Sequence, residues 1–129
     1  MILEGLLCLT LAIYHEARSE PIEDQVAVAA IVMNRVEDKD FPNSVCGVVY
    51  QTGAFSWTKS KKKRNIRESS IKNEIELKAF TKAKTIATLY LKGTLKNPIG
   101  DRKYFSKAQS FRTEYKPIKL TRKSKHVYY

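Results

Sequence analysis

The sequence predicts a mainly helical (α+β) domain with a small β element. Residues 2–17, 21–36 and 69–92 repeat apolar side chains at the three- and four-residue spacing of partly buried helices. The C-terminal part instead contains prolines, glycines and short apolar runs, which indicate loops with short strands. Its 129 residues are the length of one domain, and no linker or repeat interrupts them. We therefore expect residues 1–129 to form a single domain.

The first helix is apolar almost all round, which predicts a central position in the core. Its apolar run, residues 6–14, has no basic residue before it and is too short to span a bilayer. We therefore expect neither a signal peptide nor a membrane span here. Glu16 follows the run, so a carboxylic acid is expected at the C-terminal end of a buried helix.

The ends of the other helices also have sequence signals. Pro21 suits the first turn of the second helix, and Asp24 lies near that helix's positive end. Ser44 is placed to cap a short helix that runs through Val49. Gly93 follows the third long helix, where a glycine is typical after the last turn.

The net charge of +11 is unevenly distributed along the chain. Residues 1–58 carry three basic and eight acidic side chains, whereas residues 59–129 carry 21 basic and five acidic ones. Six of the nine residues in 59–67 are basic, and we predict a solvated, mobile loop there, with anion binding as the alternative. Nucleic acid, anionic lipid and acidic cell-wall polymer all fit such a charge.

Cys8 and Cys46 both lie in apolar stretches, which predicts two buried free thiols rather than a disulfide. No CxxC pair is present, and the two histidines, His15 and His126, are far apart. Ser19 occupies the position of the second histidine in a His-Glu-x-x-His zinc motif. We therefore expect no metal and no cofactor.

Glu16 and Glu20 are four residues apart, with His15 and Arg18 beside them. A carboxyl group against apolar surface has its charged form disfavoured, so we expect a raised pKa for Glu16, with repulsion from Glu20 acting in the same direction. A protonated carboxylic acid is what cleavage of a glycosidic bond requires. The alternative from this pattern alone is a pair of ordinary surface or capping carboxylates.

Four sequence blocks, in order, resemble the spore-cortex-lytic (SleB-type) cell wall hydrolases. They are residues 13–21 (Ile-Tyr-His-Glu-Ala-Arg-Ser-Glu-Pro), 25–29 with 34–36, 41–50, and 55–57 (Phe-Ser-Trp). The resemblance is close over residues 6–58 and looser beyond. It implies a lysozyme-like fold and lytic transglycosylase activity on peptidoglycan, of the kind that a phage endolysin supplies.

The resemblance implies that Glu16 is the catalytic acid and that Glu20 is a supporting site residue. Glu16 would protonate the oxygen between N-acetylmuramic acid (MurNAc) and N-acetylglucosamine (GlcNAc), then accept the proton of the muramic 6-hydroxyl as a 1,6-anhydro ring closes. No partner carboxylate is evident at a second motif, which favours this route over hydrolysis.

Further residues are expected to bind or support the substrate, each with a packing role as the alternative. Phe55, Ser56 and Trp57 would supply an aromatic face and a hydroxyl group for a sugar ring. Tyr104 and His126 lie where the family has an active-site tyrosine and a histidine near the C-terminus.

The sequence also departs from the family. Ser19 stands where a glycine is common, so we expect an unusual backbone conformation there. Residues 59–72 are more basic than is typical. Arg35 is expected to be a scaffold residue that pairs with Glu20.

We expect a monomer that acts on peptidoglycan glycan strands, with anionic cell-wall polymers as further candidate partners. No nucleic acid partner is expected, because aromatic residues are not interleaved with the basic run. A basic nucleic-acid-binding module and a non-catalytic cell-wall binder remain the alternative functions. With no signal peptide visible, we expect synthesis in the cytoplasm and action at the bacterial cell wall, in phage lysis or virion entry.

Overall fold

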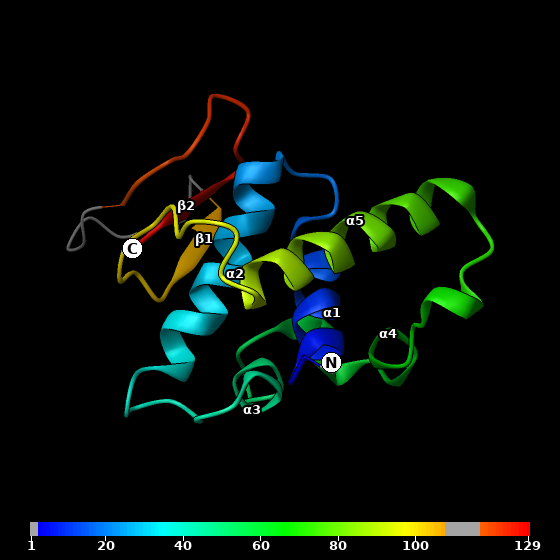
Figure 1. Cartoon of the computed structure of the whole chain (residues 1–129), viewed down its shortest axis with the longest axis horizontal. Helices are drawn as coiled ribbons and strands as arrows, with labels where there is room; N and C mark the ends of the chain where they lie inside the picture. Colours follow the sequence, from blue (N-terminus) through cyan, green and yellow to red (C-terminus); the bar gives the residue numbers. More distant parts are fainter. Residues whose placement is uncertain (1–2, 108–116) are drawn as a thin grey trace.

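The protein's structure, a computed structural model, describes residues 3–107 and 117–129 and is mainly helical (Figure 1). Its long helices are α1 (Leu6–Ala17), α2 (Ile22–Val36) and α5 (Glu74–Leu91). The shorter elements are α3 (Val45–Val49), α4 (Lys61–Arg64), the 3-10 turns η1 (Ser56–Lys59) and η2 (Glu68–Ser70), and the strands β1 (Phe105–Lys107) and β2 (His126–Tyr128). The predicted fold class, helices with a small β element, is confirmed. No helix in the described parts of the chain is long and apolar enough to cross a bilayer.

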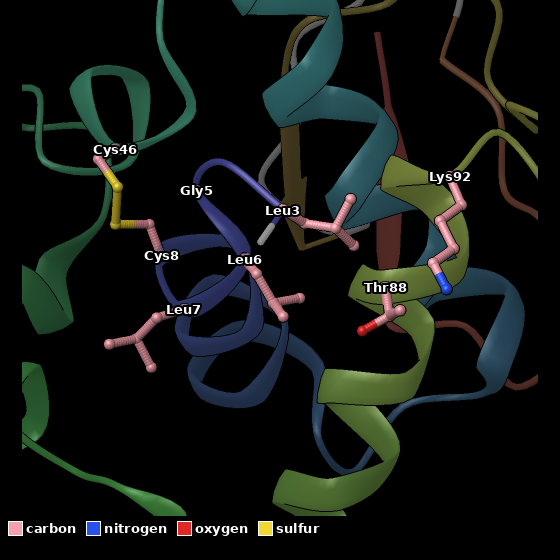
Figure 2. A pocket seen from close by; sticks show the side chains of 8 residues that line it. All are labelled: Leu3, Gly5, Leu6, Leu7, Cys8, Cys46, Thr88 and Lys92. Carbon is pink, nitrogen blue, oxygen red and sulfur yellow. A yellow bond between two sulfur atoms is a disulfide. The ribbon is translucent and has the colours of Figure 1, made fainter. Parts of the chain in front are cut away.

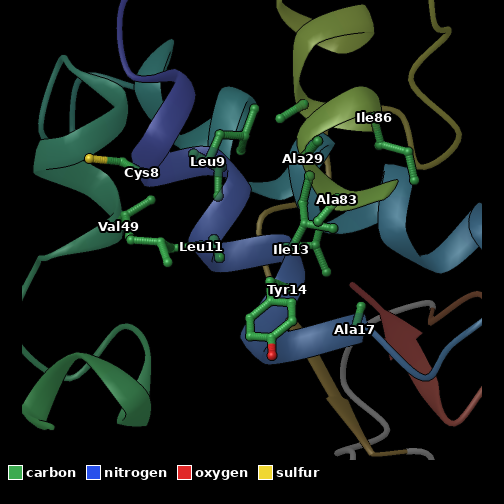
Figure 3. Close-up of a cluster of buried hydrophobic side chains, with 14 of the residues drawn as sticks. Cys8, Leu9, Leu11, Ile13, Tyr14, Ala17, Ala29, Val49, Ala83 and Ile86 are labelled. Carbon is green, nitrogen blue, oxygen red and sulfur yellow. The ribbon is translucent and has the colours of Figure 1, made fainter. Parts of the chain in front are cut away.

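Helix α1 occupies the centre of the core, as its apolar sequence predicts. It packs against α5, α2 and α3, and its Leu9, Leu11 and Ile13 side chains are almost completely buried. Figure 3 shows these side chains between Val49 of α3 and Ile86 of α5. This burial fixes the position of the residues that follow on the last turn of α1.

Two of the long helices begin several residues later than predicted, for local reasons. Gly5 has a left-handed backbone (φ 76°), and a Cβ at this position would lie 2.5 Å from the Cβ of Val45, so α1 begins at Leu6. Asn73 accepts hydrogen bonds through its side chain from two backbone N–H groups of the next turn, so α5 begins at Glu74.

Two predicted helix ends are confirmed, and one predicted loop is wrong. The Ser44 hydroxyl accepts a hydrogen bond from the backbone N–H of Gly47, and Gly93 ends α5 with φ 80°. The basic stretch 59–67, predicted as a mobile loop, instead contains helix α4. The Ser60 hydroxyl caps that helix by accepting a hydrogen bond from a backbone N–H of its first turn.

The prediction of two free thiols is also wrong, because Cys8 and Cys46 form a disulfide. Packing of α3 against α1 brings the two Cα atoms to 5.3 Å, although the residues are 38 positions apart. The disulfide joins the two helices at the N-terminal end of α1, as Figure 2 shows.

The C-terminal strand closes the molecule against α2. Strands β1 and β2 pair antiparallel, with Phe105 opposite Tyr128. Tyr128 is fully buried, and its hydroxyl donates a hydrogen bond to Asp24 Oδ1 at 2.5 Å. Ser124 donates to the other oxygen of the same carboxylate at 2.6 Å. Asp24, which the sequence placed only near a helix end, therefore holds the last strand on α2.

Candidate active site

The C-terminal end of α1 lies beside a pocket of about 440 Å³. The pocket is lined by the last turn of α1, by η1 and by α4, and its lining includes Glu16, Ser56, Trp57, Lys62 and Lys63. Among the described residues that line it, Glu16 is the one carboxylic acid. The structure thus brings together three predicted site residues, Glu16, Ser56 and Trp57, from segments about forty residues apart.

Burial raises the pKa of Glu16 above the ordinary value for a glutamic acid. The physical reason is that the buried end of α1 removes water that would otherwise solvate the carboxylate. A raised pKa keeps a carboxylic acid protonated at a higher pH, which is the state that can donate a proton to a glycosidic oxygen.

Glu20 does not contribute to this shift, contrary to our expectation of repulsion between the two carboxylates. Glu20 is 7% exposed, and its Oε1 accepts a hydrogen bond from the backbone N–H of Lys125 at 2.9 Å. The same oxygen lies 3.9 Å from Nδ1 of His126. Glu20 and His126 therefore meet at the start of β2, outside the lining of the Glu16 pocket, and their supporting roles stay predictions.

Tyr104 also lies outside that lining. Its side chain is exposed, and its ring stacks on Tyr129 with the centroids 5.8 Å apart. The Arg35 guanidinium lies 5.4 Å from the Tyr104 ring centroid, and Arg35 Nε donates a hydrogen bond to the backbone carbonyl of Lys103 at 2.8 Å. The predicted pair of Arg35 with Glu20 is therefore wrong, because Arg35 holds the segment before β1.

The aromatic residues of the 55–57 motif differ in exposure. Phe55 is 2% exposed and packs between Trp57 and Phe105, which leaves it no free face for a sugar. Trp57 is 4% exposed but borders the pocket, whereas Ser56 is exposed at its edge. Of this motif, Ser56 and Trp57 line the pocket, and sugar binding by them stays a prediction.

His15 is a site residue whose position the sequence did not indicate. Its ring packs on Trp57 with centroids 4.6 Å apart, and its Nε2 lies 3.0 Å from the backbone carbonyl oxygen of Lys63. Burial lowers the pKa of His15, so the ring is neutral near pH 7 and Nε2–H donates to that carbonyl. His15 therefore connects the end of α1 to α4. No pattern in the sequence relates residues 48 positions apart.

The backbone after α1 is ordinary. Among the described residues other than glycine, none has a positive φ, so Ser19 does not adopt the unusual conformation that we expected. In the same parts of the chain, no three His, Cys, Asp or Glu side chains gather where they could hold a metal ion.

A larger pocket of about 670 Å³ lies at the other end of α1 (Figure 2). Its lining is mainly apolar and includes Leu3, Leu6 and Leu7 beside the disulfide, with Lys92 at its edge. No carboxylic acid or histidine lies among its described lining residues. Of these two pockets at the ends of α1, the one that contains Glu16 therefore has the groups that acid–base chemistry requires.

Comparison with known proteins identifies the family. A family model described as "Cell Wall Hydrolase" matches residues 19–129, which begin just after Glu16. The chain belongs to the cell wall hydrolase family.

This cell wall hydrolase is 52% identical over 48 residues to the spore cortex-lytic enzyme of Bacillus subtilis (strain 168), a match that covers 37% of this chain and 16% of that protein. The corresponding Bacillus cereus enzyme is 51% identical over 45 residues, or 35% of this chain and 17% of that protein. The chain thus matches about a sixth of the length of these relatives.

Solved structures give the wider match. The catalytic domain of the Bacillus cereus SleB protein superposes with a TM-score of 0.65 at 27% identity, over 96% of this cell wall hydrolase and 88% of that domain. The catalytic domain of the germination-specific lytic transglycosylase SleB from Bacillus anthracis gives a TM-score of 0.64 at 27% identity, over 96% and 92%. These likenesses confirm the predicted lysozyme-like, SleB-type fold.

Proposed function

We propose that this cell wall hydrolase cleaves the glycosidic bond between MurNAc and GlcNAc in peptidoglycan, as a lytic transglycosylase. The observation that carries the proposal is Glu16, a carboxylic acid with a pKa raised by burial, beside a pocket of about 440 Å³. Family membership and the likeness to the catalytic domain of a lytic transglycosylase support it.

Glu16 performs both proton transfers in this proposal. The protonated carboxyl group donates its proton to the glycosidic oxygen as the bond to C1 of MurNAc breaks and positive charge develops on that sugar. The resulting carboxylate then takes the proton of the 6-hydroxyl group, whose oxygen bonds to C1 and closes a 1,6-anhydro ring. Glu16 ends the cycle protonated, and no water is consumed.

The composition of the pocket favours transglycosylation over hydrolysis. Retaining and inverting glycosidases commonly use a second carboxylate, as a nucleophile or as a base that activates water. No second acidic side chain lies among the described residues that line the Glu16 pocket. An internal hydroxyl group of the substrate can replace both the water and the second carboxylate.

The proposed place of action is the bacterial cell wall, with peptidoglycan strands as substrate and anionic wall polymers as additional partners. The Cys8–Cys46 disulfide supports action outside the reducing cytosol, because disulfides persist in oxidising surroundings. Phage lysis or virion entry as the setting, and the monomeric state, stay predictions.

Substitution of Glu16 by glutamine tests the proposal. We expect Glu16→Gln to slow the clearing of a peptidoglycan suspension by about 10²–10⁴-fold, because the side chain can no longer donate a proton. Glu23→Gln, which removes an exposed acid on α2, is the matched control and should clear the suspension like the wild type. Equal rates for the wild type and Glu16→Gln would refute the enzymatic proposal. Mass spectrometry of the released muropeptides decides the reaction, because anhydro ends are lighter than reducing ends by one water.

A further inference from the structure

Helix α4 forms a cationic wall on the pocket that contains Glu16. Four consecutive residues, 61–64, are basic, and Lys62 and Lys63 line the pocket. No side chain of α4 is buried, so the helix adds nothing to the core. Adjacent like charges repel each other, so the stability of the fold gives no reason for this composition.

The charges of the cationic wall are not neutralised by the protein. Lys62 and Lys63 form no ion pair with any described residue. Glu68, the acidic residue nearest along the chain, and Glu76, which pairs with another residue of the pocket lining, are engaged elsewhere. Glu68 lies 3.3 Å from Lys84, and Glu76 lies 3.3 Å from Arg18. Both ammonium groups are therefore available to an anionic ligand.

The backbone of α4 is held next to the catalytic helix. The Ser60 hydroxyl accepts a hydrogen bond from the backbone N–H of Lys63 at 3.2 Å, and the Lys63 carbonyl accepts one from His15 at 3.0 Å. These two contacts use backbone atoms of Lys63 only, so both lysine side chains stay free. Burial alone raises the pKa of Glu16, and no basic group opposes it, so the ammonium groups do not force the acid to ionise.

We propose that Lys62 and Lys63 bind carboxylates of the stem peptide and so select peptidoglycan strands that carry free carboxylates close to the bond to be cleaved. The inference rests on the proposed function, since it concerns the same pocket. In peptidoglycan the peptide is attached through the lactyl ether of MurNAc, the sugar whose glycosidic bond breaks. A MurNAc ring next to Glu16 therefore carries its peptide carboxylates within reach of flexible side chains on the pocket wall.

Binding can be measured without turnover in a Glu16→Gln background. Trp57 is the single tryptophan of the chain and borders the pocket, so its fluorescence reports ligand binding. The probe is a soluble GlcNAc–MurNAc tetrasaccharide with its stem peptides, used with free carboxylates or after carbodiimide amidation. We expect amidation to raise Kd by up to about fivefold for each exposed lysine contact. The difference should shrink as salt screens the charges.

Variants of the cationic wall assign this preference to its two lysines. The double variant Lys62→Gln/Lys63→Gln should bring the ratio of the two Kd values close to one. Lys78→Gln/Lys82→Gln removes the same charge from exposed positions on α5 outside the pocket and should keep the ratio. Arginine at positions 62 and 63 should also keep it, because the charge is retained.

Several results would overturn the proposal. One is a Kd ratio for the Lys62/Lys63 glutamine variant equal to that of the α5 control. Another is loss of folding of that variant by circular dichroism, since the charges would then serve stability. A third is binding that amidation leaves unchanged but that weakens when hydrofluoric acid removes phosphodiester polymers from whole sacculi. The recognised anion would then be a phosphate. Clearing by the wild-type enzyme is scored separately, so failure of the lysine proposal is distinct from failure of the proposed function.

Discussion

Glu16 is a carboxylic acid that the folded protein makes harder to ionise. Burial raises its pKa, so the folded chain binds the proton more tightly than the unfolded chain does. Below the ordinary glutamic acid pKa, the side chain is protonated in both states and costs no stability. As the pH rises through the raised pKa of the folded state, Glu16 ionises in a poorly solvated position and the free energy of unfolding falls.

This cost predicts that Glu16→Gln is more stable than the wild type at high pH. At pH 8 we expect the free energy of unfolding of Glu16→Gln to exceed that of the wild type by about 0.5–2 kcal/mol. A gain of this size is common when a functional residue in an unfavourable environment is replaced. Near pH 4, below the ordinary pKa, the two proteins should be equally stable. Urea unfolding followed by circular dichroism at both pH values measures the difference. If the stability difference is the same at both pH values, the ionisation of the partly buried Glu16 is not its cause.

The sequence indicated only part of the site at the level of residues. Glu16, Ser56 and Trp57 belong to motifs with a recognisable spacing, and the structure brings them to one pocket. His15 and Lys63 meet across 48 positions, a contact that no local pattern encodes. Glu20 was predicted to support the site, and its partners Lys125 and His126 lie at the start of β2, more than a hundred residues later in the chain.

At the level of elements, periodicity predicted the long helices, and tertiary contacts decided the rest. Helices α1, α2 and α5 repeat apolar residues at helical spacing because the core buries them, so the spacing predicts these helices. Helix α4 has no buried residue and therefore no pattern, and it depends on the Ser60 cap and on the contact with His15. Charge composition alone predicts a loop there.

The disulfide is an element-scale feature with a measurable effect. It closes a loop of 38 residues between α1 and α3, which restricts the unfolded chain. We expect Cys8→Ala/Cys46→Ala to lower the free energy of unfolding by about 2–4 kcal/mol. The pair lies at the opposite end of α1 from Glu16, so peptidoglycan clearing by folded protein should persist.

Reduction supplies the control for this prediction. Dithiothreitol should lower the urea midpoint of the wild type towards that of the double alanine variant and leave the variant unchanged. If reduced and oxidised wild-type proteins unfold at the same urea concentration, the disulfide does not stabilise the fold as argued.

At the scale of the whole molecule, one buried carboxylate joins the two ends of the fold. Asp24 at the start of α2 is completely buried and accepts hydrogen bonds from Ser124 and Tyr128, which lie 100 and 104 positions later. Burial and the Asp24 carboxylate raise the pKa of the Tyr128 hydroxyl, so it stays protonated and donates. From the sequence alone, Asp24 could be placed only near the end of a helix. Its distant partners, Ser124 and Tyr128, are evident only in the folded chain.

Loss of one donor should therefore weaken the whole fold rather than one strand. Tyr128→Phe keeps the buried ring but removes the hydrogen bond to the carboxylate, and we expect the free energy of unfolding to fall by about 1.5–3 kcal/mol. Ser124→Ala should have an effect of similar size, and the double variant should be non-additive because both donors serve the same carboxylate. Tyr50→Phe, at a partly exposed position, is the matched control and should change stability by less than about 0.5 kcal/mol.

Urea unfolding followed by Trp57 fluorescence and by circular dichroism should give coincident transitions, because β2 is packed on α2 through this carboxylate. Separate transitions for the two signals, or a Tyr128→Phe midpoint equal to that of Tyr50→Phe, would show that Asp24 does not hold the two ends together.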